Sequence, residues 1–249
     1  MSSENNKETP VLDSNVLAEL VEQATSSWLQ WSRVAIEQRL ELLRKWNKLL
    51  SQQKSSDLMP FHMVDFHLQQ AAMLIAEPKV MPGPTGESNI LTSLGRGIFV
   101  VMADEDVPET AFVAMICCAL VAGNSLLVAE NTRFYEILES LSCIFSLSEL
   151  EYPVVQRVNK GHIDTLLLDP RIVGMAYAGN QAEAIRLNAC LAQREGEIAQ
   201  FVNETDLTGL STVSDPYLVF RFITEKTQTI NVTAVGGNAS LLALGTGDA

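Results

Sequence analysis

The sequence predicts an α/β protein with a doubly wound, mostly parallel sheet, a layer of N-terminal helices and a protruding β arm. Strand-like and helical segments alternate through the middle of the 249-residue chain, and strands separated by helices of this length form parallel sheets through crossover connections. The strand-like segments are apolar almost throughout, as in sheets that are covered on both faces. A long segment with period-two alternation near the C-terminus predicts the arm.

Three amphipathic helices are expected before the sheet. Residues 1–12 are polar and predict a disordered tail, so we place the main domain at residues 13–210. The third helix is expected to begin after Asp57, a residue type that caps helix N-termini. The residues that recur at helical spacing are Val16, Leu17, Leu20, Val21 and Ala24 in the first helix, Ile36, Leu40, Leu43, Asn47 and Leu50 in the second, and Met63, Phe66, Gln70, Met73 and Leu74 in the third.

The segment 82–89, PGPTGESN, ends the helical layer with two prolines and two glycines in eight residues. The strands expected after it lie at 98–103, 125–129, 154–158, 172–177 and 198–203, and the helices at 108–122, 132–146, 161–168 and 181–194.

The segment 225–235, EKTQTINVTAV, alternates polar residues with Gln228, Ile230 and Val232. A period-two run rich in β-branched residues predicts a strand. Because the run follows the alternating series, we assign residues 211–249 to an arm and expect its strand to pair with residues 86–97. An exposed strand edge invites pairing with another chain, so we expect self-association or binding to a partner.

The composition argues against two classes of partner. Thirty acidic and 17 basic side chains leave a net charge of −13, whereas binding to nucleic acid or to an anionic membrane needs basic patches. The longest apolar run, 111–122, has 12 residues, which is too short to span a bilayer. The N-terminus carries no hydrophobic signal segment, and we expect a cytoplasmic protein.

No metal site or disulfide framework is predicted. The cysteines and histidines are Cys117, Cys118, Cys143, Cys190, His62, His67 and His162. Their positions lack the spacing of metal ligands. The adjacent carboxylates Asp104, Glu105 and Asp106 are expected to be largely solvated, because three carboxylates in one dry cleft would have strongly raised pKa values.

Several motifs resemble the aldehyde dehydrogenase superfamily. The segment 111–131, AFVAMICCALVAGNSLLVAEN, resembles the family's first nucleotide-binding unit, and 175–192, MAYAGNQAEAIRLNACLA, resembles the strand, turn and helix of its FTGS motif. FVNETD (201–206) is similar to the strand that ends in the family's glutamate. PGPTGESN and TEKTQTINVTAVGGNASLLALG (224–245) resemble proline utilisation A, a bifunctional branch that acts in bacterial proline catabolism.

The resemblance covers roughly residues 15–245. The resemblance implies a Rossmann-like fold with an oligomerisation flap. Within that branch, the chain specifically resembles the catalytically incomplete C-terminal domain. This chain is therefore expected to be such a domain as a separate protein.

The resemblance also implies that the catalytic parts are missing. The family's nucleophilic cysteine follows its glutamate, which matches Glu204, but none of the 45 residues after Glu204 is a cysteine. Asp106 stands nearest the asparagine of the family's PWN loop, where a carboxylate would repel an oxyanion. We therefore predict no catalytic residue, and we expect Glu204 to have a structural role.

Nucleotide binding is not expected either. The family's ribose-binding lysine corresponds to Ala129, which Glu130 follows. Gly179 of the FTGS turn is kept, but a strand-to-helix turn needs its glycine whether or not it binds phosphate. Asn180 stands where the family has serine. We predict no cofactor, and NAD remains the alternative.

The expected function is that of a non-catalytic structural or interaction module related to proline catabolism, either as a homodimer or in association with a proline-catabolic enzyme. The residues expected to form the interface are Ile230, Val232, Thr233, Gly236, Gly237 and Asn238. Two alternatives remain open: an oxidoreductase of the L-glutamate-γ-semialdehyde (1-pyrroline-5-carboxylate) dehydrogenase type, and an NAD-binding sensor without chemistry.

Overall fold

The computed structural model describes residues 14–53, 58–84, 86–146 and 150–231. Its centre is a five-stranded parallel sheet in the order β5-β4-β3-β6-β7. The strands are β3 (Ile98–Ala103), β4 (Ser125–Ala129), β5 (Val155–Val158), β6 (Ile172–Ala178) and β7 (Gln200–Glu204). The predicted doubly wound fold class is confirmed, and the ends of each strand lie within two residues of the predicted ends.

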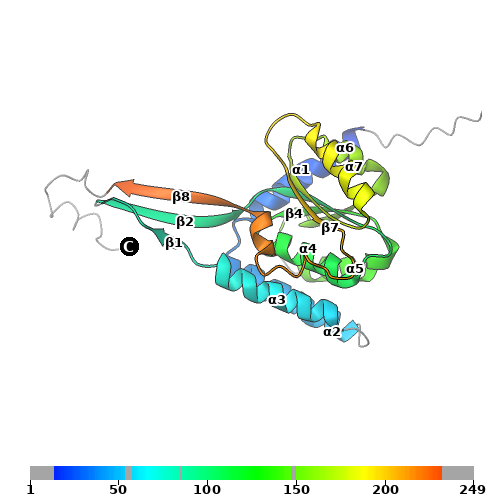
Figure 1. The fold of residues 1–249 in the computed structure, drawn as a ribbon, viewed down its shortest axis with the longest axis horizontal. Helices are drawn as coiled ribbons and strands as arrows, with labels where there is room; N and C mark the ends of the chain where they lie inside the picture. The colour runs from blue at the N-terminus through cyan, green and yellow to red at the C-terminus, as the bar shows by residue number, and fades with distance from the viewer. Residues whose placement is uncertain (1–13, 54–57, 85, 147–149, 232–249) are drawn as a thin grey trace, which may run out of the picture.

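Helices cover both faces of the sheet (Figure 1). The helices on one face are α1 (Ser14–Trp31), α6 (Ile163–Leu167) and α7 (Gln181–Ala192); those on the other are α4 (Glu109–Val121) and α5 (Tyr135–Phe145), with α2 (Ile36–Gln53) and α3 (Met59–Leu74) outside them. Because successive strand residues face opposite sides, Phe99 and Val101 pack into one core while Ile98 and Val100 pack into the other. No helix in the described ranges is long and apolar enough to cross a membrane.

Helix α4 is apolar on every side because it has no solvent-facing side. Its residues from Thr110 to Val121 are all buried, with the sheet on one side and α3 on the other. The Cys117 thiol lies 3.8 Å from the carbonyl of Val64 on α3.

The predicted inner face of the third helix was wrong for Met73, whereas Met63 and Leu74 are partly buried against the core. The buried stripe of α3 contains Phe61, Val64, Leu68 and Ala71, whereas Met73 is 68% exposed. Both stripes have helical spacing, so docking against α4, not periodicity, selects the inner face. Val16 of the first helix is also exposed, and the predicted cap of the third helix, Asp57, lies outside the described residues.

Two of the predicted helices begin with a short 3-10 turn. These turns are η1 (Thr132–Phe134) before α5 and η2 (Lys160–His162) before α6. Asn131 and Asn159 cap the turns, because their side-chain oxygens accept hydrogen bonds from the amides of Arg133 and Gly161. Local capping bonds of this kind explain why each segment starts with a tighter turn.

We call the parallel sheet and the helices that cover it the body. Between β7 and the arm, the chain packs against this body. Val213, together with Leu218 and Phe222 of η3 (Leu218–Phe222), is buried in the core on the α4 side. The buried side chain of Asn124 holds the segment in place, because its amide donates to the carbonyl of Phe222 and its oxygen accepts from the amide of Gly97. The AGN sequence that ends α4 therefore fastens the base of the arm.

The arm is a three-stranded antiparallel sheet that projects from the body (Figure 1). Its strands are β1 (Lys79–Met81), β2 (Glu87–Gly95) and β8 (Ile223–Asn231), in the order β1-β2-β8. Nine consecutive residue pairs join β2 and β8, from Glu87 opposite Asn231 to Gly95 opposite Ile223. The predicted pairing of the C-terminal strand with residues 86–97 is confirmed.

Candidate functional site

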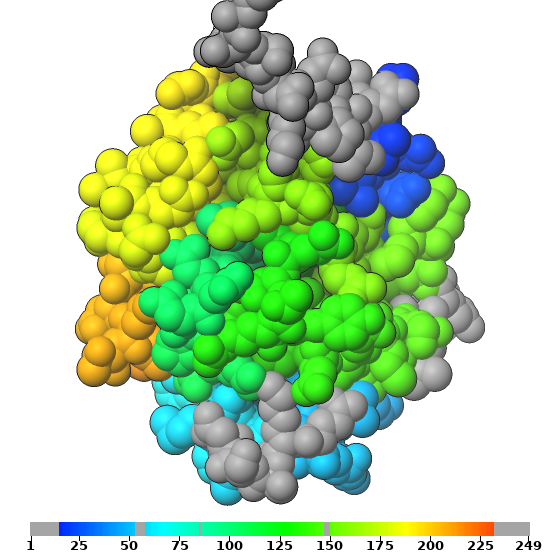
Figure 2. Space-filling model, turned by 90° about the vertical axis from the view of Figure 1, so that its right-hand side faces the viewer, coloured from blue at the N-terminus to red at the C-terminus, as the bar shows by residue number. Residues whose placement is uncertain are grey.

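The carboxyl ends of β3 and β6 form the switch point of the sheet. From β3 the strand order runs through β4 and β5 on one side and through β6 and β7 on the other. Doubly wound sheets bind ligands at the carboxyl ends of the strands where the order reverses in this way. Asp104 follows β3, and Gly179 and Asn180 follow β6. Figure 2 looks onto this end of the body, which is opposite to the arm.

Asp104 bridges the two strand ends. Its Oδ2 atom accepts hydrogen bonds from the Tyr177 hydroxyl at 2.7 Å, from the Asn180 backbone amide at 3.2 Å and from the Asn180 side-chain amide at 2.9 Å. Its own backbone amide donates to the carbonyl of Ala178. Lys160, the first residue of η2, places its Nζ 3.9 Å from Oδ1. Burial and the bond to Asp104 raise the pKa of Tyr177 well above its usual range, so the phenol stays protonated and continues to donate.

These bonds occupy the N-terminus of α7. The positive end of a helix dipole and its free amides form a natural phosphate site. Here the Asn180 amide donates to Asp104, and the Glu183 amide donates to the Asn180 side chain at 2.9 Å. The Asp104 carboxylate therefore lies at this helix start, where a dinucleotide phosphate would meet its negative charge.

Gly179 has a structural reason to be glycine. Its φ is +155°, and a Cβ atom at this position would collide with the Asp104 carboxylate and the Tyr177 hydroxyl. The surviving glycine of the FTGS-like turn is thus explained by close packing at the switch point, without a nucleotide.

The expectation that all three carboxylates of the acidic loop are solvated was wrong for Asp104. Its side chain is only 18% exposed, because the two strand ends close around it. Glu105 and Asp106 are exposed as predicted. The sequence offered a signal for the bridging role of Asp104, because this acidic residue directly follows a predicted strand. It offered no comparable signal for its partner Tyr177.

The end of β4 offers no cationic group at the position of the family's lysine. The Ala129 side chain is 4% exposed and packs in the core with Tyr177. Glu130 is exposed, and its amide belongs to the sheet because it donates to Val158. Next to it, Asn131 donates from its side chain to the carbonyl of Ala103.

None of the four thiols lies at the switch point as an activated nucleophile. Cys117 and Cys118 are fully buried within α4, and burial raises the pKa of both thiols. Burial also raises the pKa of Cys190 on α7, whose sulfur lies 3.8 Å from the carbonyl of Asp164. Cys143 is exposed on α5. A thiol with a raised pKa holds less of the nucleophilic thiolate.

Glu204 is an internal anchor. Its side chain is 1% exposed at the end of β7. One carboxylate oxygen accepts from the amide of Asp206 at 2.9 Å, and the other accepts from the amides of Thr212 at 2.7 Å and Val213 at 3.0 Å. Both oxygens are therefore engaged in closing the loop that follows β7, and the predicted structural role is confirmed.

Within the part of the chain that the structure describes, no group of three or more histidine, cysteine, aspartate or glutamate side chains could hold a metal ion.

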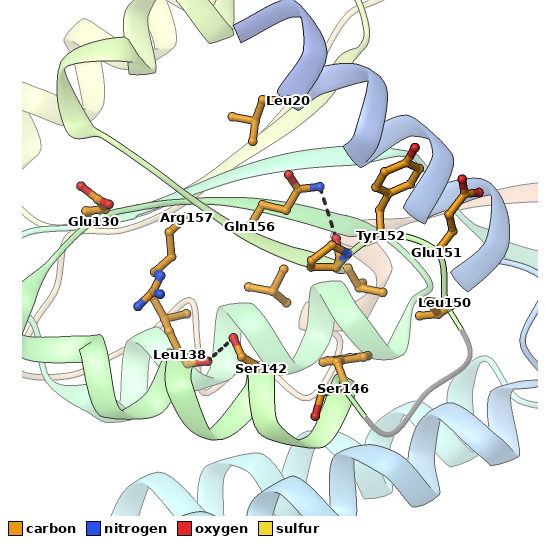
Figure 3. Close-up of a pocket in the computed structure, with 14 residues that line it drawn as sticks. Leu20, Glu130, Leu138, Ser142, Ser146, Leu150, Glu151, Tyr152, Gln156 and Arg157 are labelled. Atoms are coloured by element: carbon orange, nitrogen blue, oxygen red, sulfur yellow. Dashed lines mark hydrogen bonds between the residues drawn. The ribbon is translucent and has the colours of Figure 1, made fainter. Parts of the chain in front are cut away.

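A cavity of about 650 Å³ lies away from the switch point, along the outer edge of β5 (Figure 3). Although large apolar cavities are common ligand sites, this one contains none of the residues that match the family's motif positions, apart from Glu130 at its rim. Leu20 of α1 faces it from one side, and Leu138 and Ser142 of α5 face it from the other.

One face of the arm carries four apolar side chains among polar ones such as Lys226 and Gln228. Residues directly opposite one another in a ladder share a face, so Val80, Ile90, Leu94 and Ile230 lie on one face of the arm. Val80 is 83% exposed and Ile230 is 46% exposed. Of the predicted interface residues, only Ile230 is described; Val232, Thr233, Gly236, Gly237 and Asn238 lie outside the described residues.

The sequence is similar to part of the PutA proteins. It is 25% identical over 167 residues to the bifunctional protein PutA of Salmonella typhimurium and 29% identical over 167 residues to that of Rhizobium meliloti. These alignments cover 67% and 66% of this chain but 11% and 12% of the relatives, so the chain spans about a tenth of the length of the curated relatives that it matches. No protein-family model matches the chain.

Solved structures show the same relationship. A proline utilization A (PutA) structure with proline bound in remote sites has a TM-score of 0.66 at 25% identity, over 77% of this chain and 22% of that chain. An aldehyde dehydrogenase from Brucella melitensis biovar abortus 2308 has a TM-score of 0.64 at 16% identity, over 79% of this chain and 44% of that chain. The fold is therefore that of the aldehyde dehydrogenases and of the corresponding part of PutA.

Proposed function

We propose that this chain is a non-catalytic relative of PutA and the aldehyde dehydrogenases, and that it acts as a structural or interaction module in proline catabolism. The observation that carries the proposal is the Asp104 carboxylate, which occupies the N-terminus of α7 at the switch point. A dinucleotide phosphate at that place would have to displace a carboxylate and meet its negative charge. The buried thiols of Cys117 and Cys118 and the uncharged Ala129 support the same conclusion.

The arm supplies the interaction surface of this module. On one face, Val80, Ile90, Leu94 and Ile230 present apolar side chains that a partner would cover. The partner is a second copy of this chain or a proline-catabolic enzyme of the PutA type. A stable interface of this kind buries more than about 1,000 Å² in total.

Calorimetric titration with NAD tests the non-catalytic part of the proposal. We expect no binding at millimolar NAD, and no NADH formation with L-glutamate-γ-semialdehyde. Replacing the blocking carboxylate, Asp104→Ala, is expected to leave the chain without turnover, because no thiol lies at the site. Steady-state NADH production by the unaltered protein would establish the dehydrogenase alternative, and micromolar NAD affinity without turnover would establish the sensor alternative.

The interaction part is tested by solution mass, measured by light scattering, alone and with the partner enzyme. We expect Ile230→Asp to dissociate the assembly, because the aspartate would be buried against apolar side chains. Thr227→Asp is the matched control, since Thr227 is exposed on the opposite face of the same strand. The proposal fails if the protein is a monomer that binds no PutA-type enzyme, or if both variants assemble like the unaltered protein.

A further inference from the structure

The outer edge of β5 has main-chain groups without partners. β5 is an edge strand of the parallel sheet and pairs only with β4 among the described strands. The amide of Leu126 on β4 donates to the carbonyl of Val154. Because alternate residues of a parallel strand face the same neighbour, the N–H and C=O groups of Val155 and Arg157 point away from β4. Within the described ranges no other group pairs with them.

A groove lined by both apolar and polar side chains runs along this edge. The cavity of about 650 Å³ is bounded by α1 on one side and α5 on the other (Figure 3). Leu138 and Phe145 of α5 line it together with Val155 of the strand itself, and Leu20 of α1 stands across from them. The groove is therefore positioned to receive side chains from a segment lying beside the strand.

A row of free main-chain groups next to a partly apolar groove is the arrangement that binds an extended peptide by strand addition. The backbone of the added strand pairs with the edge, and every second side chain enters the groove. A compact small molecule would fill the groove but would leave the strand edge unpaired. The two features together favour a strand as the occupant.

The charges at the rim of the groove favour basic residues at both ends of the added strand. Glu130 and Glu151 lie toward opposite ends of the groove (Figure 3). Arg157 is neutralised by Glu139, whose oxygen lies 2.8 Å from its guanidinium. In the described part of the chain neither Glu130 nor Glu151 forms an ion pair, and Glu151 accepts only a 3.4 Å bond from the neutral Gln30 side chain. The rim is therefore net negative.

We propose that the outer edge of β5 binds an extended segment of a partner protein that has apolar residues at alternate positions and a lysine or arginine at each end. The segment adds a sixth strand to the parallel sheet, its apolar side chains enter the groove beside Leu138, and its basic ends meet Glu130 and Glu151. This surface is on the body and does not involve the arm, so the inference goes beyond the proposed function and stands or falls separately from it.

The test uses the full chain and three fluorescein-labelled heptapeptides in anisotropy titrations at low salt. The first is Lys-Val-Thr-Val-Thr-Val-Lys, which has the proposed pattern. The second replaces both lysines with glutamate. The third replaces both threonines with proline, which removes main-chain donors while the charge is kept. We expect the first peptide to bind at least ten-fold more tightly than either of the others.

Two substitutions at Arg157 distinguish the contribution of its main-chain N–H to peptide binding from that of its side chain. Arg157→Pro removes an outward N–H and no bond to β4, a placement that edge strands tolerate. Arg157→Ala removes the same side chain and keeps the N–H. We expect the first to weaken binding of the lysine peptide at least ten-fold and the second to leave it unchanged or tighter. Thermal melting checks that both variants fold.

Hydrogen exchange locates the bound peptide even if Arg157→Pro does not fold. The lysine peptide is expected to slow exchange in the segment 150–158 of the unaltered protein, and Glu130→Gln combined with Glu151→Gln is expected to abolish its preference over the glutamate peptide. Equal affinity for the three peptides, equal affinity of the proline and alanine variants, or protection confined to the arm would overturn the proposal.

Discussion

At the residue scale, the carboxylates of Asp104 and Glu204 stabilise the ends of two strands by accepting hydrogen bonds. Asp104 and Glu204 each follow or end a strand, and each accepts bonds from the amides of a neighbouring loop or helix. Charged acceptors form the stronger class of hydrogen bond. Both groups therefore stabilise the fold, Glu204 at the position that resembles the family's glutamate, and the sequence alone shows only their residue types.

Glu204→Gln should destabilise the protein although the residue has no catalytic role. An amide side chain has one acceptor oxygen, so it cannot satisfy the three amides of Asp206, Thr212 and Val213 that the carboxylate serves. Losing charged bonds in a buried place costs about 2 to 3 kcal/mol. Urea unfolding measures the loss. Glu195→Gln, at an exposed position, is the control and should change the free energy of unfolding by less than about 0.5 kcal/mol; equal losses would refute the anchoring role.

At the element scale, the end of α4 is the point where body and arm are joined. Gly123 ends the helix with φ at +96°, and the next residue, Asn124, bonds to Gly97 at the start of β3 and to Phe222 at the end of η3. The Arg39 guanidinium packs directly on Gly123, and burial lowers the pKa of Arg39 to about 10. Gly123 therefore lies where the end of α4, the base of the arm and helix α2 meet.

Gly123→Ala should cost more stability than a positive φ alone explains. A Cβ atom at Gly123 would collide with the buried Arg39 side chain, and forced overpacking typically costs about 1 to 3 kcal/mol. Gly196→Ala is a matched control, because Gly196 also has a positive φ, +101°, but faces open space. Urea unfolding of the two variants should differ by at least about 1 kcal/mol in free energy. Equal destabilisation would mean that Arg39 moves aside freely.

At the scale of the whole molecule, the segment that follows β7 holds the outer helices on the body. His67 of α3 lies with its Nε2 2.7 Å from the carbonyl of Val213, in the loop that Glu204 closes from the other side. Because His67 is 1% exposed, burial lowers its pKa below 6.5. The neutral ring therefore belongs to the folded state, and the unfolded chain gains a proton more readily.

The stability of the protein should consequently fall in mild acid. Above pH 6.5 His67 is neutral in both the folded and the unfolded state, so its contribution to the free energy of unfolding is complete. As the pH drops toward the lowered pKa of the folded state, the unfolded state binds the proton first and becomes favoured. His67→Gln keeps a donor for Val213 and cannot titrate, so it should flatten the dependence of the unfolding free energy between pH 7.5 and 5.5. His62→Gln, exposed on the same helix, should leave the slope unchanged. Similar slopes for all three proteins would contradict the assignment.

The sequence by itself determined the alternation of strands and helices, the parallel sheet and the pairing of the arm. These features depend on local periodicity and on segment length, and both are read along the chain without knowledge of what lies opposite. The continuous apolar character of 98–103 and 125–129 identified central strands, and the period-two run before residue 235 identified an arm strand that pairs with β2.

Only the tertiary structure decided which face of α3 is buried, which of three adjacent carboxylates is enclosed, and where the sheet has a free edge beside a groove. Met73 and Leu68 both fit a helical stripe, and the contact with α4 selects Leu68. Asp104 differs from Asp106 because Tyr177 and Asn180, more than 70 residues further along the chain, reach it across the switch point. Burial and hydrogen bonding are properties of pairs of distant segments, and a local pattern carries no information about the partner that a fold brings to it.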